Sequence, residues 1–299
     1  MTKQFSRTES QITKLFKPTS SFQYQAQKYT VLKSGKPAIA KGECKTDTYV
    51  LAKSQNGQKK EFKISIKQSN ADFLENKIKL ERAMEILGNN ASHIITASIA
   101  AIKHEFQNDY LVYFKKNGRT EANTMKIGWK FELLNKKSGK KSGELKLSPS
   151  QILDVYAGTN LDISKKNAMI NSDIIANSGV ANYILETQPY AGQSLQSIID
   201  KMIPLDSYCQ DKKVYFACKA INYRATKDKW DGNRPLVVYV EWTYQSGKIK
   251  SKLVFDKPLI KKANEIGNNI RNIVRSNGFT FNFEKIELLL DKNITNYYK

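Results

Sequence analysis

Two strand-like segments separated by Asn56-Gly57 constrain the fold of this chain more than any other feature. Residues 46–53 and 60–68 are rich in β-branched and aromatic side chains, and Asn-Gly between two such runs is the strongest local signal for a β-hairpin. The second segment alternates strictly between apolar and polar residues, as a strand with one buried face does. Its apolar face consists of Phe62, Ile64 and Ile66, and its polar face consists of Glu61, Lys63, Ser65 and Lys67.

The rest of the chain mixes predicted helices with predicted strands. We therefore expect an α/β (α+β) fold in which a mixed central β-sheet is flanked by helices. Helices are predicted at 4–16, at 71–87 with Ser69 or Asn70 as N-cap and Gly88 as stop, after Ser148-Pro149-Ser150, within 164–185, and at 258–275. Strands are predicted at 29–32, 109–115, 125–134, 213–223, 235–244 and 249–255. A boundary near 135–150 would separate residues 1–145 from residues 146–299.

The charge of the chain indicates the class of its partner. Its 299 residues include 49 Lys and Arg against 28 Asp and Glu, which gives a net charge of +21. Such an excess favours a polyanionic partner, with nucleic acid ahead of an anionic membrane surface. The sequence has no apolar run long enough to span a membrane and no export signal at its start, so we expect a cytoplasmic protein.

Several kinds of catalytic and metal site are excluded by the residues present. Cys44, Cys209 and Cys218 form no CxxC pair, and His93 and His104 do not have the spacing of a zinc site. Neither a phosphate-binding GxxxxGK[ST] loop nor a GxSxG nucleophile motif occurs. The hairpin remains as the candidate for a catalytic site, because charged residues gather there on one face of a strand whose other face is buried.

Strand pairing brings Asp47 close to the end of the second strand. With Asn56-Gly57 at the centre of a two-residue turn, Asp47 pairs near residues 65–67, whereas Glu61 lies roughly 15 Å further along the ladder at about 3.3 Å per residue. A regular turn would place Asp47 opposite Ile66, on the wrong face to meet Lys67. A bulge, or a turn one residue longer or shorter, is therefore required for Asp47 and Lys67 to converge.

Lys45-Thr46-Asp47, followed after the hairpin by Ile64-Ser65-Ile66-Lys67-Gln68, resembles the metal site of the PD-(D/E)xK nucleases. Within that superfamily it is most similar to type II restriction endonucleases with a KTD…SIK form of the motif, and the resemblance covers residues 43–87. Thr46 stands where the family usually has Pro, and Ser65 stands where it usually has an acidic residue. The resemblance implies a restriction-endonuclease-like fold with both strands in the middle of the sheet.

The resemblance also implies roles for these residues. Asp47 would bind Mg²⁺, the carbonyl of Ile66 would complete the metal shell, Ser65 would occupy the second acidic position, and Lys67 would orient the attacking water and offset charge in the transition state. A second carboxylate would come from Glu43, Glu75 or Glu9, and we rank Glu43 first because it is nearest to Asp47 in the chain.

Residues that would contact DNA are predicted less specifically. Those beside the motif are Lys45, Lys63 and Gln68, and those in the basic loop 135–143 are Lys136, Lys137, Lys140 and Lys141. Further candidates are Arg224 and Arg234, whose guanidinium groups suit base contacts, and Lys248 and Lys250 on a basic strand. We place the DNA-recognition region in residues 146–299 and the nuclease core in residues 1–145.

The sequence thus predicts a Mg²⁺-dependent, sequence-specific endonuclease of double-stranded DNA. By the resemblance, a cognate DNA methyltransferase would protect the host genome, and cleavage of both strands would favour a homodimer. Two alternatives remain: a structure-selective or repair nuclease, including a phage enzyme, and a basic DNA-binding protein without catalysis.

Overall fold

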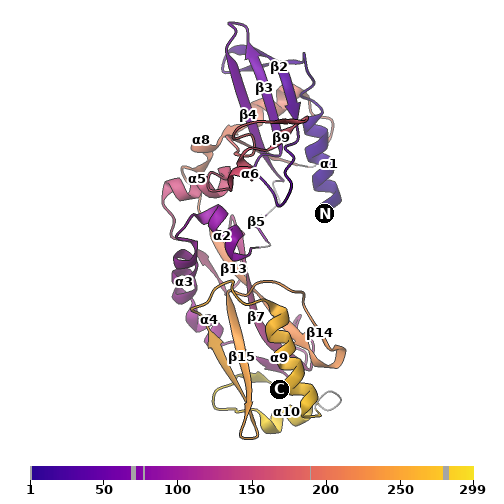
Figure 1. Ribbon diagram of the computed structural model, residues 1–299, viewed down its shortest axis with the longest axis vertical. Helices are drawn as coiled ribbons and strands as arrows, with labels where there is room; N and C mark the ends of the chain where they lie inside the picture. The colour runs from indigo at the N-terminus through magenta and orange to yellow at the C-terminus, as the bar shows by residue number, and fades with distance from the viewer. Residues whose placement is uncertain (1, 69–71, 77, 189, 279–282) are drawn as a thin grey trace. The chain divides into compact units, whose positions relative to one another are not determined.

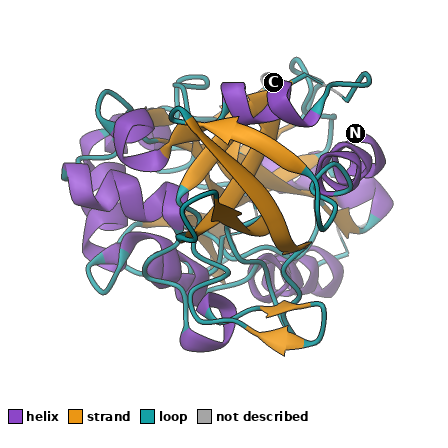
Figure 2. Ribbon diagram, turned by 90° about the horizontal axis from the view of Figure 1, so that it is seen from above, coloured by secondary structure: helices purple, strands orange, loops and turns teal. Residues whose placement is uncertain are grey.

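A computed structural model describes residues 2–68, 72–76, 78–188, 190–278 and 283–299. Strands and helices both occur throughout the described chain (Figure 2), which confirms the predicted mixed α/β fold. The residues form two compact units. Unit 1 consists of Met1–Asp72, Glu85–Gly88 and Leu147–Lys212, and unit 2 consists of Phe73–Met84, Asn89–Lys146 and Lys213–Lys299. One crossing between them, Lys146 to Leu147, falls at the expected boundary, but each unit draws segments from both sides of it.

Unit 1 is built on a mixed six-stranded sheet in the order β1-β2-β3-β4-β11-β12. The strands are β1 (Ser21–Tyr24), β2 (Gln27–Gly35), β3 (Thr48–Ser54), β4 (Lys59–Gln68), β11 (Tyr183–Thr187) and β12 (Ile203–Pro204). β4 lies inside the sheet, antiparallel to β3 and parallel to β11. The predicted hairpin is therefore present, and its second strand is covered by a neighbour on each side.

Helices and one small hairpin complete unit 1. The helices are α1 (Thr2–Thr13), α5 (Pro149–Ala157), α6 (Ile163–Lys166), α7 (Leu195–Lys201) and α8 (Leu205–Cys209), and the hairpin joins β9 (Met169–Ile170) to β10 (Asp173–Ile174). α1 lies beside β3 (Figure 1). One hydrophobic cluster joins Ile12 and the nearby Phe16 to α7 and to the apolar face of β4. This packing fixes α1 against the face of the sheet that the alternation predicted to be buried.

Unit 2 contains a nine-stranded sheet in the described residues, with the central order β14-β13-β7-β15-β16. Its strands are β5 (Phe73–Glu75), β6 (Val112–Tyr113), β7 (Thr124–Leu134), β8 (Ser142–Glu144), β13 (Tyr215–Arg224), β14 (Lys229–Trp230), β15 (Val238–Gln245), β16 (Lys248–Val254) and β17 (Tyr297–Tyr298). Its helices are α3 (Ala91–Ala101), α4 (Lys103–Gln107), the 3₁₀ turn η1 (Ala225–Lys227), α9 (Ala263–Ser276) and α10 (Glu284–Leu289). The core contains Trp129, Phe131, Phe216 and Trp242, all nearly inaccessible to solvent.

Two predicted helices are wrong over part of their length. In the segment 71–87 only α2 (Leu80–Leu87) is helical, because residues 73–75 form β5 and pair with β7; Ser69, Asn70 and Ala71 lie outside the described residues. In the segment 164–185, the short α6 is followed by the β9–β10 hairpin and by the start of β11. The hairpin turn places Asn171 and Ser172 at positive φ, which a helix does not allow.

Candidate active site

Asp47 lies immediately before β3 and is tied to β4 by two hydrogen bonds. Its backbone N–H donates to the carbonyl of Ile64 at 2.9 Å, and its Oδ2 accepts from the backbone N–H of Ile66 at 2.7 Å. Backbone N–H groups of a strand point sideways, toward the neighbouring strand in the plane of the sheet. The bond from Ile66 therefore holds the Asp47 carboxylate near this plane, just before β3 begins. One carboxylate oxygen is thereby fixed and the side chain has little freedom to rotate.

The turn of the hairpin sets the register that this geometry needs. The Ser54 N–H donates to the carbonyl of Gln58 at 2.9 Å, so the loop contains three residues, with Gly57 at a φ of +88°. Thr48 consequently pairs with Ile64, and the same register places Asp47 opposite Ser65. The two-residue turn of the sequence analysis is wrong, and the turn one residue longer is the alternative that occurs.

Lys67 stands near the end of β4 on the same face as Ser65. Its side chain is partly buried, and its positive charge acts to lower the pKa of Asp47. The opposite face of β4, made of Phe62, Ile64 and Ile66, is completely buried as predicted. Asp47 and Lys67 are therefore electrostatically coupled across the two strands of one hairpin.

A second carboxylate is supplied by Glu9 of α1. Glu9 is only 6% exposed and lies one helical turn before Ile12, on the side of α1 that faces the sheet. Thr13 fixes the helix at this point, since its hydroxyl donates to the Glu9 carbonyl at 2.9 Å and lies 2.6 Å from the hydroxyl of Thr48, the residue after Asp47. The negative charge of Glu9 acts to raise the pKa of Asp47.

The group ranked first for the second carboxylate, Glu43, is exposed on the segment before the site. Glu75 belongs to unit 2, where it forms an ion pair with Arg82 at 2.5 Å. The carboxylate that acts on Asp47 is Glu9, from a helix that the hydrophobic core holds against β3. The choice of Glu43 stays a prediction, and Glu9 is the alternative whose charge acts on Asp47.

Charges around Asp47 are only partly balanced. Burial is the largest influence and raises the pKa of Asp47 to about 6; the negative charge of Glu9 adds to this, whereas Lys67, the Ile66 N–H and Lys36 oppose it. Lys36 binds Glu9 Oε2 at 2.6 Å. Burial alone would lower the pKa of Lys36, but its hydrogen bond to Glu9 and the charges of Glu9 and Asp47 outweigh burial and raise it.

The site fits a hard divalent cation better than a soft one. Two carboxylates are present, and Mg²⁺ is typically held by one or two carboxylates with phosphate oxygens and waters completing its shell. Backbone carbonyls of successive residues in a strand point to opposite neighbouring strands. The Lys63 carbonyl accepts from the Asn182 N–H on the β11 side, and the Ile64 carbonyl accepts from the Asp47 N–H on the β3 side. The carbonyl of Ile66, two residues further along, therefore also points to the side of Asp47. Within the described residues no cluster of three or more His, Cys, Asp or Glu side chains has metal-binding geometry, so an all-protein metal cage is not seen there.

Cys44 lies at the margin of the site. Its thiol is partly buried and donates a hydrogen bond of 3.3 Å to the Thr46 carbonyl. Burial, followed by the negative charge of Asp47, raises the pKa of this thiol to about 11. The neutral thiol is a poor ligand and a poor nucleophile near neutral pH.

The other predicted residues are distributed over both units. In unit 1, Ser65 and Lys45 are buried, Lys63 forms a 3.8 Å ion pair with Glu61, and Gln68 is partly buried. In unit 2, the residues that are exposed to solvent are Lys136, Lys137, Lys140, Arg234 and Lys248, and Lys250 is partly exposed.

Two candidates of unit 2 are already engaged by acidic side chains. Lys141 binds Asp109 at 2.8 Å, and Arg224 binds Asp231 at 2.5 Å and Glu121 at 3.4 Å. The loop 135–143 therefore presents three of its four lysines to solvent and uses the fourth in a structural ion pair.

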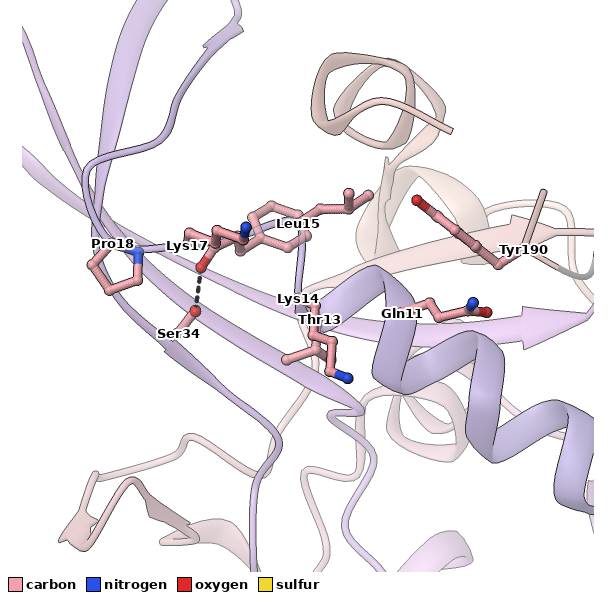
Figure 3. A pocket seen from close by; sticks show the side chains of 9 residues that line it. Gln11, Thr13, Lys14, Leu15, Lys17, Pro18, Ser34 and Tyr190 are labelled. Atoms are coloured by element: carbon pink, nitrogen blue, oxygen red, sulfur yellow. Dashed lines mark hydrogen bonds between the residues drawn. The ribbon is translucent and has the colours of Figure 1, made fainter. Parts of the chain in front are cut away.

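A pocket of about 570 Å³ lies at the C-terminal end of α1 (Figure 3). In it the Ser34 hydroxyl donates to the backbone carbonyl of Phe16, which links β2 to the segment after α1. Its described lining contains no carboxylate and is made of Gln11, Thr13, Lys14, Leu15, Phe16, Lys17, Pro18, Ser34 and Tyr190. The carboxylates of Asp47 and Glu9 therefore do not line this pocket, although Thr13, which contacts Thr48, does.

No family model, curated protein or solved structure matches the chain. Among the helices that the structure describes, none is both long enough and apolar enough to cross a membrane. The function is therefore inferred from the residues around Asp47 and from the distribution of charge.

Proposed function

We propose that this protein is a Mg²⁺-dependent endonuclease that hydrolyses phosphodiester bonds of double-stranded DNA at a specific sequence, as type II restriction enzymes do. One observation carries the proposal: Asp47 is fixed by the Ile66 N–H at 2.7 Å, with the charges of Glu9 and Lys67 both acting on it. The PD-(D/E)xK resemblance requires two acids beside a lysine. Here Asp47 and Lys67 belong to one hairpin, and α1 supplies the second acid, Glu9.

Asp47 and Glu9 would hold Mg²⁺, together with the carbonyl of Ile66. When bound, Mg²⁺ polarises the scissile phosphate and lowers the pKa of the attacking water. The partly buried ammonium group of Lys67 orients that water and offsets the negative charge that develops on the phosphate. The hydrogen bond from Ile66 keeps the Asp47 carboxylate in one orientation throughout.

The distribution of charge supports DNA as the substrate. Unit 2 contains 31 Lys and Arg against 15 Asp and Glu, so it carries +16 of the net charge of +21. Phosphate contacts from basic residues provide most of the affinity of proteins for DNA. Unit 1 thus supplies the hydrolytic residues and unit 2 supplies most of the charge that would attract the polymer. A methyltransferase that protects host DNA, and a homodimer that cuts both strands, are implied by the same proposal.

The test is incubation of unmethylated phage DNA with the purified protein and Mg²⁺. Wild-type protein should give discrete fragments, and Lys67→Ala should lose them. Lys59→Ala is the matched control, because Lys59 is an exposed lysine at the opposite end of β4 and its replacement should leave the fragments unchanged.

Metal binding gives a readout that does not depend on cleavage. Wild-type protein should bind Mn²⁺ in calorimetry, whereas Asp47→Asn and Glu9→Gln should weaken that binding by about 10-fold or more, since each removes one charged ligand. Branch-selective nicking in place of fragments would favour a structure-selective nuclease. Salt-sensitive DNA binding without Mg²⁺-dependent cleavage would leave a basic DNA-binding protein.

A further inference from the structure

Helix α9 presents an unusual polar stripe on the surface of unit 2. Its apolar side packs on β7, β13 and β15, and α9 lies along β15 in Figure 1. The residues buried by this packing are Ala263, Ile266, Gly267, Ile270, Ile273 and Val274. On the outer side Asn268, Asn272 and Arg275 are exposed at helical spacings of four and three, so they follow one another along one face.

The composition of this stripe differs from that of an ordinary solvated helix face. The first turn of α9 contains Glu265, which pairs with Lys261 at 3.0 Å. Residues 266–276 contain no acidic residue and no lysine, so this part of the helix lacks the Glu–Lys pairs that usually stabilise an exposed surface. Asn is a poor helix former. Asn269 has a structural reason to be there, because its amide donates to the Trp242 carbonyl at 2.7 Å. Asn268 accepts a hydrogen bond of 3.4 Å from Nη1 of Arg271, and Asn272 is exposed.

Arginine side chains beside the stripe are held in place. The guanidinium group of Arg271 lies 4.4 Å from the ring centre of Trp230, and its Nε donates to Asp228 at 2.7 Å. Arg275 also binds the Asp228 carboxylate, while its side chain remains 56% exposed. Gly267 permits this arrangement, since a Cβ there would come within 3.0 Å of the Trp230 ring. Two guanidinium groups thus share one carboxylate, and Arg275 has N–H donors left to face outward.

We infer that α9 is a recognition helix that enters the major groove of duplex DNA, with Asn268, Asn272 and Arg275 contacting base edges. This inference rests on the proposed function and adds to it the element that reads the sequence. The helix has 14 residues, about 21 Å in length at 1.5 Å per residue, and the major groove admits an α-helix. Asn pairs with adenine and Arg with guanine through two hydrogen bonds each. The charge of +16 on unit 2 makes DNA the complementary partner for this face.

The experiment selects DNA sequences with the full-length protein in the absence of divalent metal, so that no cleavage occurs. The probe is a library of short duplexes with a randomised centre, and the bound fraction is sequenced. Wild-type protein should enrich one defined sequence, and Asn272→Ala should lose preference at one base pair of it, by about 10-fold. Because Ala favours helices more than Asn, the melting temperature of this variant should not fall, which excludes unfolding as the cause.

Arg275→Lys separates base reading from charge. Lysine keeps the positive charge, so the salt dependence of binding should stay unchanged while the preference for guanine at one position weakens. Arg119→Lys is the matched control, because Arg119 is exposed elsewhere in unit 2. Its enriched sequence should be that of the wild type.

Two results would overturn the assignment of α9. One is an unchanged enriched sequence in both α9 variants, and the other is loss of preference in Lys248→Ala or Lys250→Ala but not in the α9 variants. These outcomes are separable from failure of the nuclease proposal, which concerns cleavage with Mg²⁺ and the residues of unit 1. A protein that selects a sequence through α9 and never cuts DNA would refute the nuclease and retain the recognition helix.

Discussion

The Asp47→Asn substitution removes a partly buried negative charge and leaves the shape of the side chain almost unchanged. Asp47 has its pKa raised from 3.8 to about 6 by burial and by Glu9. At 1.36 kcal/mol per pKa unit, ionised Asp47 therefore destabilises unit 1 by about 2–3 kcal/mol once the pH exceeds 6. An amide oxygen can still accept the hydrogen bond of the Ile66 N–H, so Asp47→Asn should be more stable than wild type by that amount at pH 7.5 without metal.

The sign of the pH dependence follows from the raised pKa. Between pH 4 and pH 6 the native state keeps a proton on Asp47 that the unfolded chain has lost, so the stability of wild type falls as the pH rises through this range. Below pH 4 both states are protonated, and the difference between wild type and Asp47→Asn should approach zero. Mg²⁺ at pH 7.5 should restore stability to wild type and not to the variant, because only wild type keeps both carboxylates.

Urea unfolding at several pH values measures the effect, and the chain supplies its own control. Trp129, Trp230 and Trp242 are the three tryptophans, and all belong to unit 2. Tryptophan fluorescence should therefore be unchanged by the substitution, whereas hydrogen exchange of β3 and β4 amides should slow at pH 7.5. A variant that is less stable than wild type at pH 7.5, or a difference that does not vary with pH, would refute the electrostatic account of this site.

Three further substitutions test neighbouring parts of the argument. Glu9→Gln should lower the pKa of Asp47, because it removes the negative charge that raises it, and carboxyl NMR titration would show the change. Asp109→Ala should destabilise unit 2 by about 3–5 kcal/mol in urea unfolding, since it leaves the buried Lys126 without its 2.7 Å partner. Burial would raise the pKa of Asp109, but Lys126 and Lys141 outweigh it and hold this pKa below its usual range. The ion pairs of Asp109 should therefore stop stabilising wild type as the pH falls below 4, whereas Asp109→Ala has no such pairs to lose. Gly267→Ala should cost about 1–3 kcal/mol and change tryptophan fluorescence, because the new methyl group meets Trp230 at 3.0 Å.

The elements that sequence predicted well are those determined by neighbouring residues. The hairpin required only two β-rich segments and Asn56-Gly57, and both of its strands are present. α5 begins at Pro149 with Ser148 as its N-cap, where a capping box satisfies the first backbone groups. The predicted register was wrong by one residue. A two-residue Asn-Gly turn needs positive φ at both Asn56 and Gly57, but only Gly57 has it, and the loop contains three residues. A local pattern identifies a hairpin more reliably than it identifies the turn.

Elements that depend on distant partners were predicted poorly. The start of β11 is apolar and falls at the end of the helix predicted within 164–185. The strand instead pairs in parallel with β4, more than a hundred residues earlier, and all but one of its residues are buried. A buried parallel strand and a short buried helix have similar apolar runs, so periodicity does not separate them. Asn171 and Ser172 adopt positive φ in the turn of the β9–β10 hairpin. Asn and Ser are common turn residues, and the helical interpretation overlooked this local signal.

Glu9 shows how a candidate site residue can be found from its position on a helix. Glu9, Ile12, Thr13 and Phe16 have the spacing of one helical face, and Ile12 and Phe16 are completely buried. An acidic residue on the buried face of an amphipathic helix loses hydration and needs a compensating charge, whether from a side chain such as Lys36 or from a cation. Glu43 lies closer to Asp47 in the chain but is exposed. The burial of an acid among apolar residues is thus the stronger signal, and it leads to the same candidate site that the hairpin defines.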